Sequence, residues 1–255
     1  DLHSFPTRRS SDLRTSWERR KLLSEYRSLK GMRTKEINKL HAIFEHNGYT
    51  QFVRKDMNNE KNRANILPLL KGYEKEEAER LIERLSVLEK QIKQLLHKIN
   101  AEVEKDTKIQ KAMTVPGVGP ITALAYVAHV GDVKRFKNAH QVSNFIGFVP
   151  KVDNSCTICR SGHTTKRGNP LLRSLLVQAA WSTVRSKAGG ALREKYTYMA
   201  ETRCIGKGKS IVTTARKLGE LLYLILKTDQ DYKPQKFIIP ESKISKLTGE
   251  ALNCS

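Results

Sequence analysis

The chain has 255 residues, with 47 Lys and Arg against 26 Asp and Glu, and a formal net charge of +21. This excess of positive charge is larger than solubility requires and indicates a polyanionic partner, nucleic acid rather than a membrane surface. No apolar run reaches the length of a membrane span, which argues against a membrane protein. The cysteine content, without a recognisable secretory signal, predicts free thiols in a reducing cytoplasm.

The first 13 residues, DLHSFPTRRSSDL, show neither helical periodicity nor an apolar face, unlike the sequence from Arg14 onward. They resemble translated sequencing-adapter read-through, which is found at the ends of reading frames assembled from environmental DNA. We therefore leave residues 1–13 out of the prediction of the fold. On this interpretation the natural protein begins further upstream, and the chain is a C-terminal fragment.

Two helical stretches follow, separated by a polar connector. From about Ser16 to His46, apolar residues recur at helical spacing and predict a long amphipathic helix that ends at Asn47-Gly48. Over residues 73–112, a second helix carries a coiled-coil seam of Leu81, Leu85, Leu88, Ile92, Leu95 and Ile99. A seam this narrow must be buried against another helix, which is either the first helix folded back or the same segment of a second chain.

After Lys111 the composition shifts toward Gly, Ala and Val, which predicts a domain boundary near residue 112. The expected helices of the domain at 113–227 lie at about 120–129, 138–146, 170–187, 192–203 and 210–227, with an irregular segment before residue 168. The tail over 228–255 is polar and expected to be loosely ordered. The predicted fold class is all-α, with long helices that form a coiled coil and then a compact helical domain.

The positive charge is concentrated in this second domain. Residues 134–217 contain 17 basic and 3 acidic residues, so the nucleic-acid-binding face is expected there. The stretch VPGVGPITA at 115–123 places Gly117 and Gly119 before a helix that starts at Pro120, the pattern of a helix-hairpin-helix element. Glycines let the backbone approach a phosphate closely, although the same pattern also suits a tight turn between packed helices.

A second helix start lies in TTKRGNPLLRSLLVQAAW, where Asn169 is a natural N-cap and Pro170 a natural first residue. Fixed positive charge and helix-end amides are expected to meet a phosphate here. The residues assigned to this contact are Lys166, Arg167, Gly168, Asn169 and Arg173.

The segment NSCTICRSGH, before that helix, allows several interpretations. Cys156 and Cys159 have metal-knuckle spacing, but only His163 is near enough to be a further ligand, and no βαβ pattern supports a redox pair. Ser155 lies beside the cationic helix start, where a hydroxyl could attack a phosphodiester. A solvated loop serine is the alternative that the residues alone leave open.

The order of these motifs resembles the C-terminal half of the DEDD-type insertion-sequence transposases of the IS-one-ten family. The stretches that carry the resemblance are TVPGVGPITA, GDVKRFKNAHQVSNFIGFVP and TTKRGNPLLRSLLVQAAW, and the match runs from about Arg14 to Lys227. Proteins of this family are similar to site-specific DNA recombinases, with an acidic RNase-H-like domain, a coiled coil and a helical domain that carries a nucleophilic serine. An RNA encoded by the element guides recognition of donor and target.

The resemblance implies a role for each part of the chain. Counted without gaps from Pro150, the family's nucleophilic serine corresponds to Ser155, which would hold DNA as a phosphoserine ester. Residues 14–72 would link to a missing RNase-H-like domain, and a Mg ion is expected in that domain, with no cofactor or metal ligand in this chain. The implied partners are DNA, the guide RNA and a second copy bound through the coiled coil, in the cytoplasm of a prokaryote.

A truncated transposase of this kind is expected to bind nucleic acid and to be inactive alone. The rival hypothesis is a non-catalytic helix-hairpin-helix protein that binds DNA or RNA through the same basic face.

Overall fold

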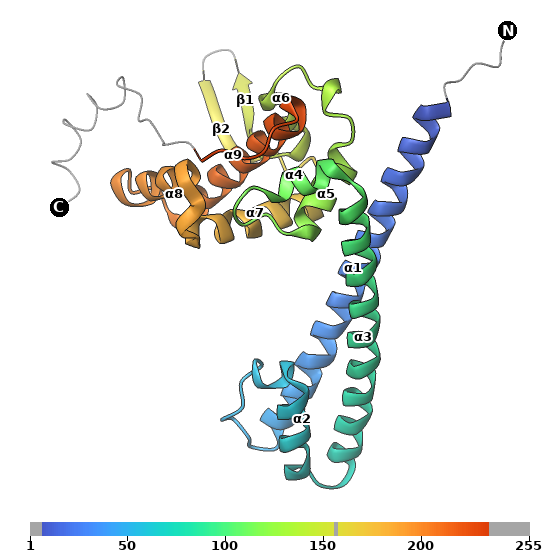
Figure 1. Ribbon diagram of the computed structural model, residues 1–255. Helices are drawn as coiled ribbons and strands as arrows, with labels where there is room; N and C mark the ends of the chain where they lie inside the picture. Colours follow the sequence, from blue (N-terminus) through green and yellow to red (C-terminus); the bar gives the residue numbers. More distant parts are fainter. Residues whose placement is uncertain (1–6, 156–157, 235–255) are drawn as a thin grey trace. The chain divides into compact units, whose positions relative to one another are not determined.

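A computed structural model describes the backbone of residues 7–155 and 158–234 and the side chains of residues 13–149 and 164–234 (Figure 1). Helices dominate these ranges, which confirms the all-α prediction, and the strands described form one two-stranded hairpin. None of the helices in the described part combines the length and apolar character needed to cross a membrane. The chain divides into unit 1, residues 1–105, and unit 2, residues 106–255.

Unit 1 is a hairpin of two long helices joined by a short helical connector (Figure 1). Its elements are α1 (Thr7–His46), η1 (Asp56–Asn58), α2 (Glu60–Ile66), η2 (Leu67–Leu69) and α3 (Gly72–Lys105). Helix α1 begins earlier than the predicted start at Ser16. The two long helices are antiparallel, because Arg19 pairs with Glu102 at 3.3 Å and Arg33 pairs with Glu89 at 2.8 Å.

The predicted seam of α3 is buried inside this hairpin. Its residues Leu81, Leu85, Ile92, Leu95 and Ile99 are buried. They pack against the buried stripe of α1, which includes Leu23, Leu40 and Phe44. Of the two partners that the sequence left open, the folded-back helix is therefore the one that covers the seam. The homo-oligomer expected through this seam stays a prediction, and a second copy would have to bind a surface other than the buried seam.

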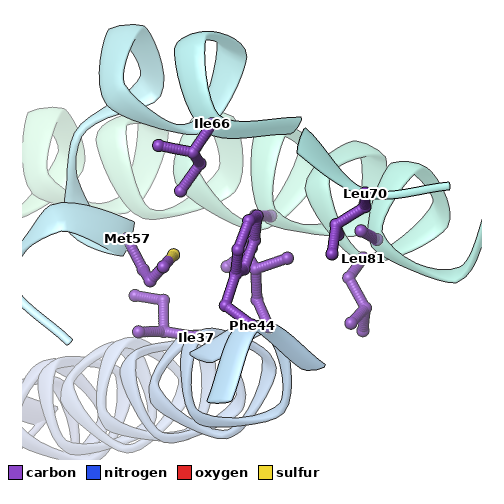
Figure 2. Packing of buried hydrophobic residues seen from close by; sticks show 9 residues of the cluster. Ile37, Phe44, Met57, Ile66, Leu70 and Leu81 are labelled. Atoms are coloured by element: carbon purple, nitrogen blue, oxygen red, sulfur yellow. The ribbon is translucent and has the colours of Figure 1, made fainter. Parts of the chain in front are cut away.

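At the connector end of unit 1, the two long helices and the connector enclose an apolar cluster (Figure 2). Figure 2 shows Phe44 between Met57, Ile66 and Leu81. The Phe44 ring also meets Phe52 edge to face, with 5.8 Å between ring centroids. Aromatic and aliphatic burial of this kind is what fixes the connector against the long helices.

A buried ion-pair network lies next to this cluster. Arg63 is 1% exposed, and its guanidinium donates to both carboxylate oxygens of Glu89 at 3.1 and 2.8 Å. Arg33 donates to the same carboxylate at 3.0 Å and to Asn58 of the connector at 3.0 Å. Burial disfavours the ionised form of Glu89, but the two arginines outweigh it and hold the pKa of Glu89 below its usual range.

Unit 2 starts at Asp106, which caps α4 by accepting the Lys108 amide at 2.9 Å, so the division falls before the predicted residue 112. Its first half contains α4 (Thr107–Met113), α5 (Pro120–Val130), η3 (Val133–Arg135), α6 (Ala139–Ile146), β1 (Pro150–Ser155) and β2 (Ile158–Thr164). Its second half contains α7 (Pro170–Arg185), η4 (Lys187–Gly189), α8 (Gly190–Thr197), η5 (Tyr198–Thr202) and α9 (Lys207–Thr228).

Helix α9 forms the centre of unit 2, with α6, α7 and α8 packed on it (Figure 1). Tyr126 of α5 is fully buried and donates its hydroxyl to the Gly219 carbonyl of α9 at 2.6 Å. Burial raises the pKa of Tyr126, so this hydroxyl keeps its proton. Tyr223 of α9 donates in the same way to the Phe136 carbonyl at 2.9 Å. These bonds anchor the segments around α5 and α6 to the core.

Glu220 ties α6 to α9. Its carboxylate accepts from Ser143 at 2.8 Å, from Arg216 at 3.1 Å and from Lys217 at 2.6 Å, and Ser143 itself is 1% exposed. Burial disfavours the charged form, but the bonds from Lys217 and Ser143 outweigh this effect, so the pKa of Glu220 is lowered.

This lowered pKa predicts an acid-sensitive link in unit 2. A carboxylate whose pKa is lower in the folded state stabilises the fold above its ordinary range, and the stabilisation is lost as the pH falls through the folded pKa. Glu220→Gln should lower the urea midpoint of unit 2 at neutral pH and make its acid dependence shallower. Glu201→Gln, on an exposed side chain, is the control. If both variants keep the wild-type acid dependence, Glu220 is not the group responsible.

The segment after α6 differs from the prediction of an irregular stretch. Strands β1 and β2 are antiparallel, and the backbone of Ser155 pairs with that of Ile158 at the end of the hairpin. The register is interrupted between Pro150 and Val152. This hairpin was not predicted because the sequence has no Asn-Gly or Asp-Gly pair at its turn.

Candidate functional site

The turn between α4 and α5 gives its two glycines different roles. Gly117 has a φ of +89°, and a Cβ there would lie 2.5 Å from the backbone nitrogen of Thr183 on α7. The Thr183 hydroxyl is 2.7 Å from the Pro116 carbonyl oxygen. Gly119, the N-cap of α5, would have no atom within 4 Å of its Cβ. Gly117 therefore allows the turn to pack closely against α7. Of the two glycines, only Gly119 faces open space where a phosphate could approach.

At the start of α7, where a phosphate contact was predicted, the Asn169 cap already bonds the first backbone amides. The Asn169 side chain accepts the amides of Leu171 at 2.9 Å and Leu172 at 3.1 Å. Pro170 has no amide proton, and the Arg173 amide donates to the Asn169 carbonyl at 3.2 Å. The first-turn amides are thus already bonded within the chain. Asn169 acts here as the predicted helix cap, and its phosphate contact stays a prediction.

Arg173 also has an internal role in this structure. One nitrogen of its guanidinium, Nη1, donates to the carbonyl of Ile146 at 3.1 Å and to the carbonyl of Gly168. A cation suits this position, because the end of α6 presents unpaired carbonyl groups. Burial lowers the pKa of Arg173. Arg173 therefore acts as a clamp between α6 and the loop before α7, and its phosphate contact stays a prediction.

Two glycines make the clamp possible. A Cβ on Gly168 would overlap the carbonyl oxygens of Phe145 and Ile146. Gly147 ends α6 with a φ of +86°, and a Cβ there would lie 2.9 Å from the Gly168 nitrogen. Gly168 thus permits close packing of the loop on α6, and its predicted phosphate contact is not needed to explain its presence.

Lys166 and Arg167 are the predicted residues that the structure leaves exposed. Both side chains project from the loop of residues 165–168, which we call the clamped loop. The backbone of this loop is fixed by bonds from the Thr165 amide to the Val149 carbonyl at 2.8 Å and from the Lys166 amide to the Gly147 carbonyl at 3.3 Å. Two cations on a fixed loop are suited to contact a sugar-phosphate backbone.

Ser155 lies at the end of β1, in the hairpin that leads into the clamped loop. Its side chain is outside the described residues, as are Cys156 and the side chains of Cys159 and His163. The nucleophile and the metal-knuckle interpretation therefore stay predictions. Among the side chains described, no group of three or more His, Cys, Asp or Glu is placed to hold a metal ion. The described side chains do not fit a Mg site, so no reaction step is assigned to a metal bound by them.

One feature of the site was not predicted from the sequence, a contact between an arginine and two aromatic rings. Arg135, the last residue of η3, lies over the rings of Phe136 and Phe145, with its guanidinium carbon 4.5 and 4.6 Å from their centroids. Phe145 is 41% exposed. A signal was present in the sequence, since Phe145 lies off the apolar stripe of Val142 and Ile146 on α6. An aromatic side chain on the polar face of a helix in a basic region points to a contact surface.

Residues 109–197 match the model of the Transposase IS116/IS110/IS902 family. The segment is similar to insertion-sequence transposases. It extends from α4 into α8 and contains every site residue discussed above. We call it the transposase-like segment.

Several proteins encoded by insertion elements or named as transposases are similar to parts of this chain. A "Probable family 20 transposase" of Pseudomonas aeruginosa is 30% identical over 154 residues, which are 60% of this chain and 46% of that protein. The "Transposase for insertion sequence element IS1111A" of Coxiella burnetii is 29% identical over 135 residues, 53% of this chain and 37% of that protein. An IS110 insertion-element protein of Streptomyces coelicolor is 24% identical over 155 residues, 60% and 37% of the two chains. The chain thus spans less than half the length of these relatives.

Proposed function

We propose that the chain is the DNA-handling part of an insertion-sequence transposase that cuts and rejoins DNA through a phosphoserine intermediate. The observation that carries the proposal is the family match over residues 109–197, which overlaps the basic stretch of residues 134–217. Basic side chains on a fixed loop supply the sequence-independent phosphate contacts that a DNA-processing enzyme needs.

In this proposal Ser155 is the nucleophile. Its hydroxyl oxygen attacks a phosphodiester phosphorus, a serine–phosphate bond forms, and the bond from phosphorus to one sugar oxygen breaks. The serine proton passes to a base, and the departing sugar oxygen takes up a proton. A second strand then attacks the phosphoserine ester with its own hydroxyl, which restores the serine and completes the exchange. Lys166 and Arg167 are proposed to neutralise the phosphates on either side of the reacting bond.

The acidic groups that would activate the reaction are expected outside this chain. A Mg ion, where an RNase-H-like domain supplies its ligands, would stabilise the charge of the transition state. The contribution of this chain is the nucleophile, the phosphate contacts and their placement. The chain alone is proposed to bind DNA and the guide RNA without exchanging strands.

The test is a serine substitution in a protein extended upstream by the acidic domain, from the natural gene or from a relative. Wild-type protein should form covalent adducts with end-labelled element DNA that survive denaturing gel electrophoresis. Ser155→Ala should abolish the adducts and leave DNA affinity unchanged, because only the attacking oxygen is removed. Ser174→Ala, an exposed serine on α7, is the matched control and should keep them.

Adducts that persist in Ser155→Ala would assign the nucleophile to another residue. If no variant forms adducts while DNA binding is retained, the non-catalytic nucleic-acid-binding protein becomes the better description.

A further inference from the structure

We propose that Arg135 and Phe145 form a stacking site for an unpaired nucleobase, next to the clamped loop that contacts the phosphates. The inference rests on the proposed nucleic-acid function and adds that the strand bound at this site is unpaired. Phosphate contacts alone do not distinguish a duplex from a single strand. An exposed aromatic ring and a planar cation favour a single strand, because only an unpaired base offers a free face for stacking.

The cluster is buried at its base and open at its top. Phe136 is 9% exposed and lies beneath Arg135, while Phe145 is 41% exposed, and the two rings are tilted with centroids 5.6 Å apart. The exposed guanidinium of Arg135 lies against both rings. A base that approaches from solvent would therefore meet one cationic plane and the free part of one aromatic ring.

The cluster is held in place before any ligand arrives. Tyr223 contacts the Phe136 ring edge to face at 6.5 Å and donates to the Phe136 carbonyl. Helix α6, which carries Phe145, is fixed to α9 by the bond from Ser143 to Glu220. Two ring contacts restrain Arg135, a side chain that otherwise loses considerable rotamer freedom when it binds. Preorganisation of this kind increases affinity because less ordering occurs on binding.

The site is continuous with the phosphate contacts. The Phe145 carbonyl lies against Gly168, so the clamped loop with Lys166 and Arg167 packs directly on the helix that carries the ring. Lys134 and Lys137 are exposed on either side of Arg135 and Phe136. The carboxylate nearest in sequence, Asp132, accepts the Lys134 amide at 2.9 Å as the cap of η3. Basic residues around an aromatic platform are the arrangement that single-stranded nucleic acid uses.

The test compares the ring with an aliphatic side chain of similar size. The full chain is titrated into fluorescein-labelled single-stranded DNA, single-stranded RNA and duplex DNA, and affinity is read from fluorescence anisotropy. Phe145→Leu should weaken single-strand binding by about 5- to 100-fold, whereas Phe145→Trp should retain it, because only the ring stacks. Duplex binding should be the same in wild type and both variants. A larger loss on RNA than on DNA would identify RNA as the preferred source of the base.

Arg135→Lys provides a second measurement, because it keeps the charge and removes the planar group. It should weaken single-strand binding and spare duplex binding, with an unchanged thermal unfolding midpoint. The proposal is overturned if Phe145→Leu and Phe145→Trp bind single strands equally well, or if single-strand and duplex affinity fall together. Failure of the wild-type chain to bind any of the three ligands would instead contradict the proposed function itself.

Discussion

Arg63→Ala is expected to destabilise unit 1 by about 2–5 kcal/mol, because it empties the volume of a buried side chain and leaves the part-buried Glu89 carboxylate with Arg33 alone. The Arg63 side chain is 1% exposed, and its two bonds to Glu89 join α2 to α3. Arg33 would remain beside Glu89, but at an angle set by its own contacts with Asn58. Urea unfolding followed by circular dichroism measures the loss, since the helices α1 and α3 make up most of unit 1.

Two further variants separate charge from packing at this site. Arg63→Met combined with Glu89→Leu removes both charges and fills the volume, so it should recover most of the stability that Arg63→Ala loses. Arg14→Ala breaks an exposed pair with Glu18 and should change stability by less than about 1 kcal/mol. If Arg63→Ala is as mild as Arg14→Ala, the buried pair does not stabilise the connector.

Gly117→Ala is expected to destabilise unit 2 by at least about 2 kcal/mol, and Gly119→Ala to be almost neutral. The two glycines are two residues apart in one turn, yet only Gly117 has a positive φ, +89°, and only its Cβ would meet α7. The new methyl group would press on the Thr183 nitrogen and on the Ala179 carbonyl oxygen, which lies 2.8 Å away. Both are backbone atoms that a change of side-chain rotamer cannot move. Thermal unfolding of the full chain measures both variants.

The same pair of variants tests which glycine meets a phosphate. Gly119→Ala should weaken duplex binding without changing stability if the α5 start contacts DNA. Equal destabilisation by both substitutions would show that the turn, rather than contact with α7, requires glycine at both positions.

The helices of this protein were predictable because their signals are local. Asn138 and Asn169 cap α6 and α7, and Pro170 starts α7 where the sequence placed it. The seam of α3 was predictable for the same reason, since its spacing is a property of one helix. Its partner was not predictable, because a seam has the same spacing whether the covering helix belongs to the same chain or to another.

The arrangement of the candidate site could be predicted only in part. Lys166 and Arg167 are exposed as expected, but the roles of Asn169 and Arg173 depend on which carbonyl and amide groups lie near them after folding. Gly117 and Gly119 look equivalent in the sequence, but they differ in backbone conformation and in what packs against them. The contact between Arg135 and Phe145 joins residues of η3 and α6, and no local sequence pattern predicts a contact between two elements. Local chemistry thus predicted the elements, and tertiary contact decided the roles.

The clamp made by Arg173 has a consequence for how a ligand is met. Because one guanidinium bonds both the end of α6 and the loop before α7, it links the residues proposed to stack a base with those proposed to contact phosphates. If both proposals hold, a nucleic-acid strand would have to adapt its own backbone to the spacing between the two groups. The cost of bending or unstacking would then fall on the strand.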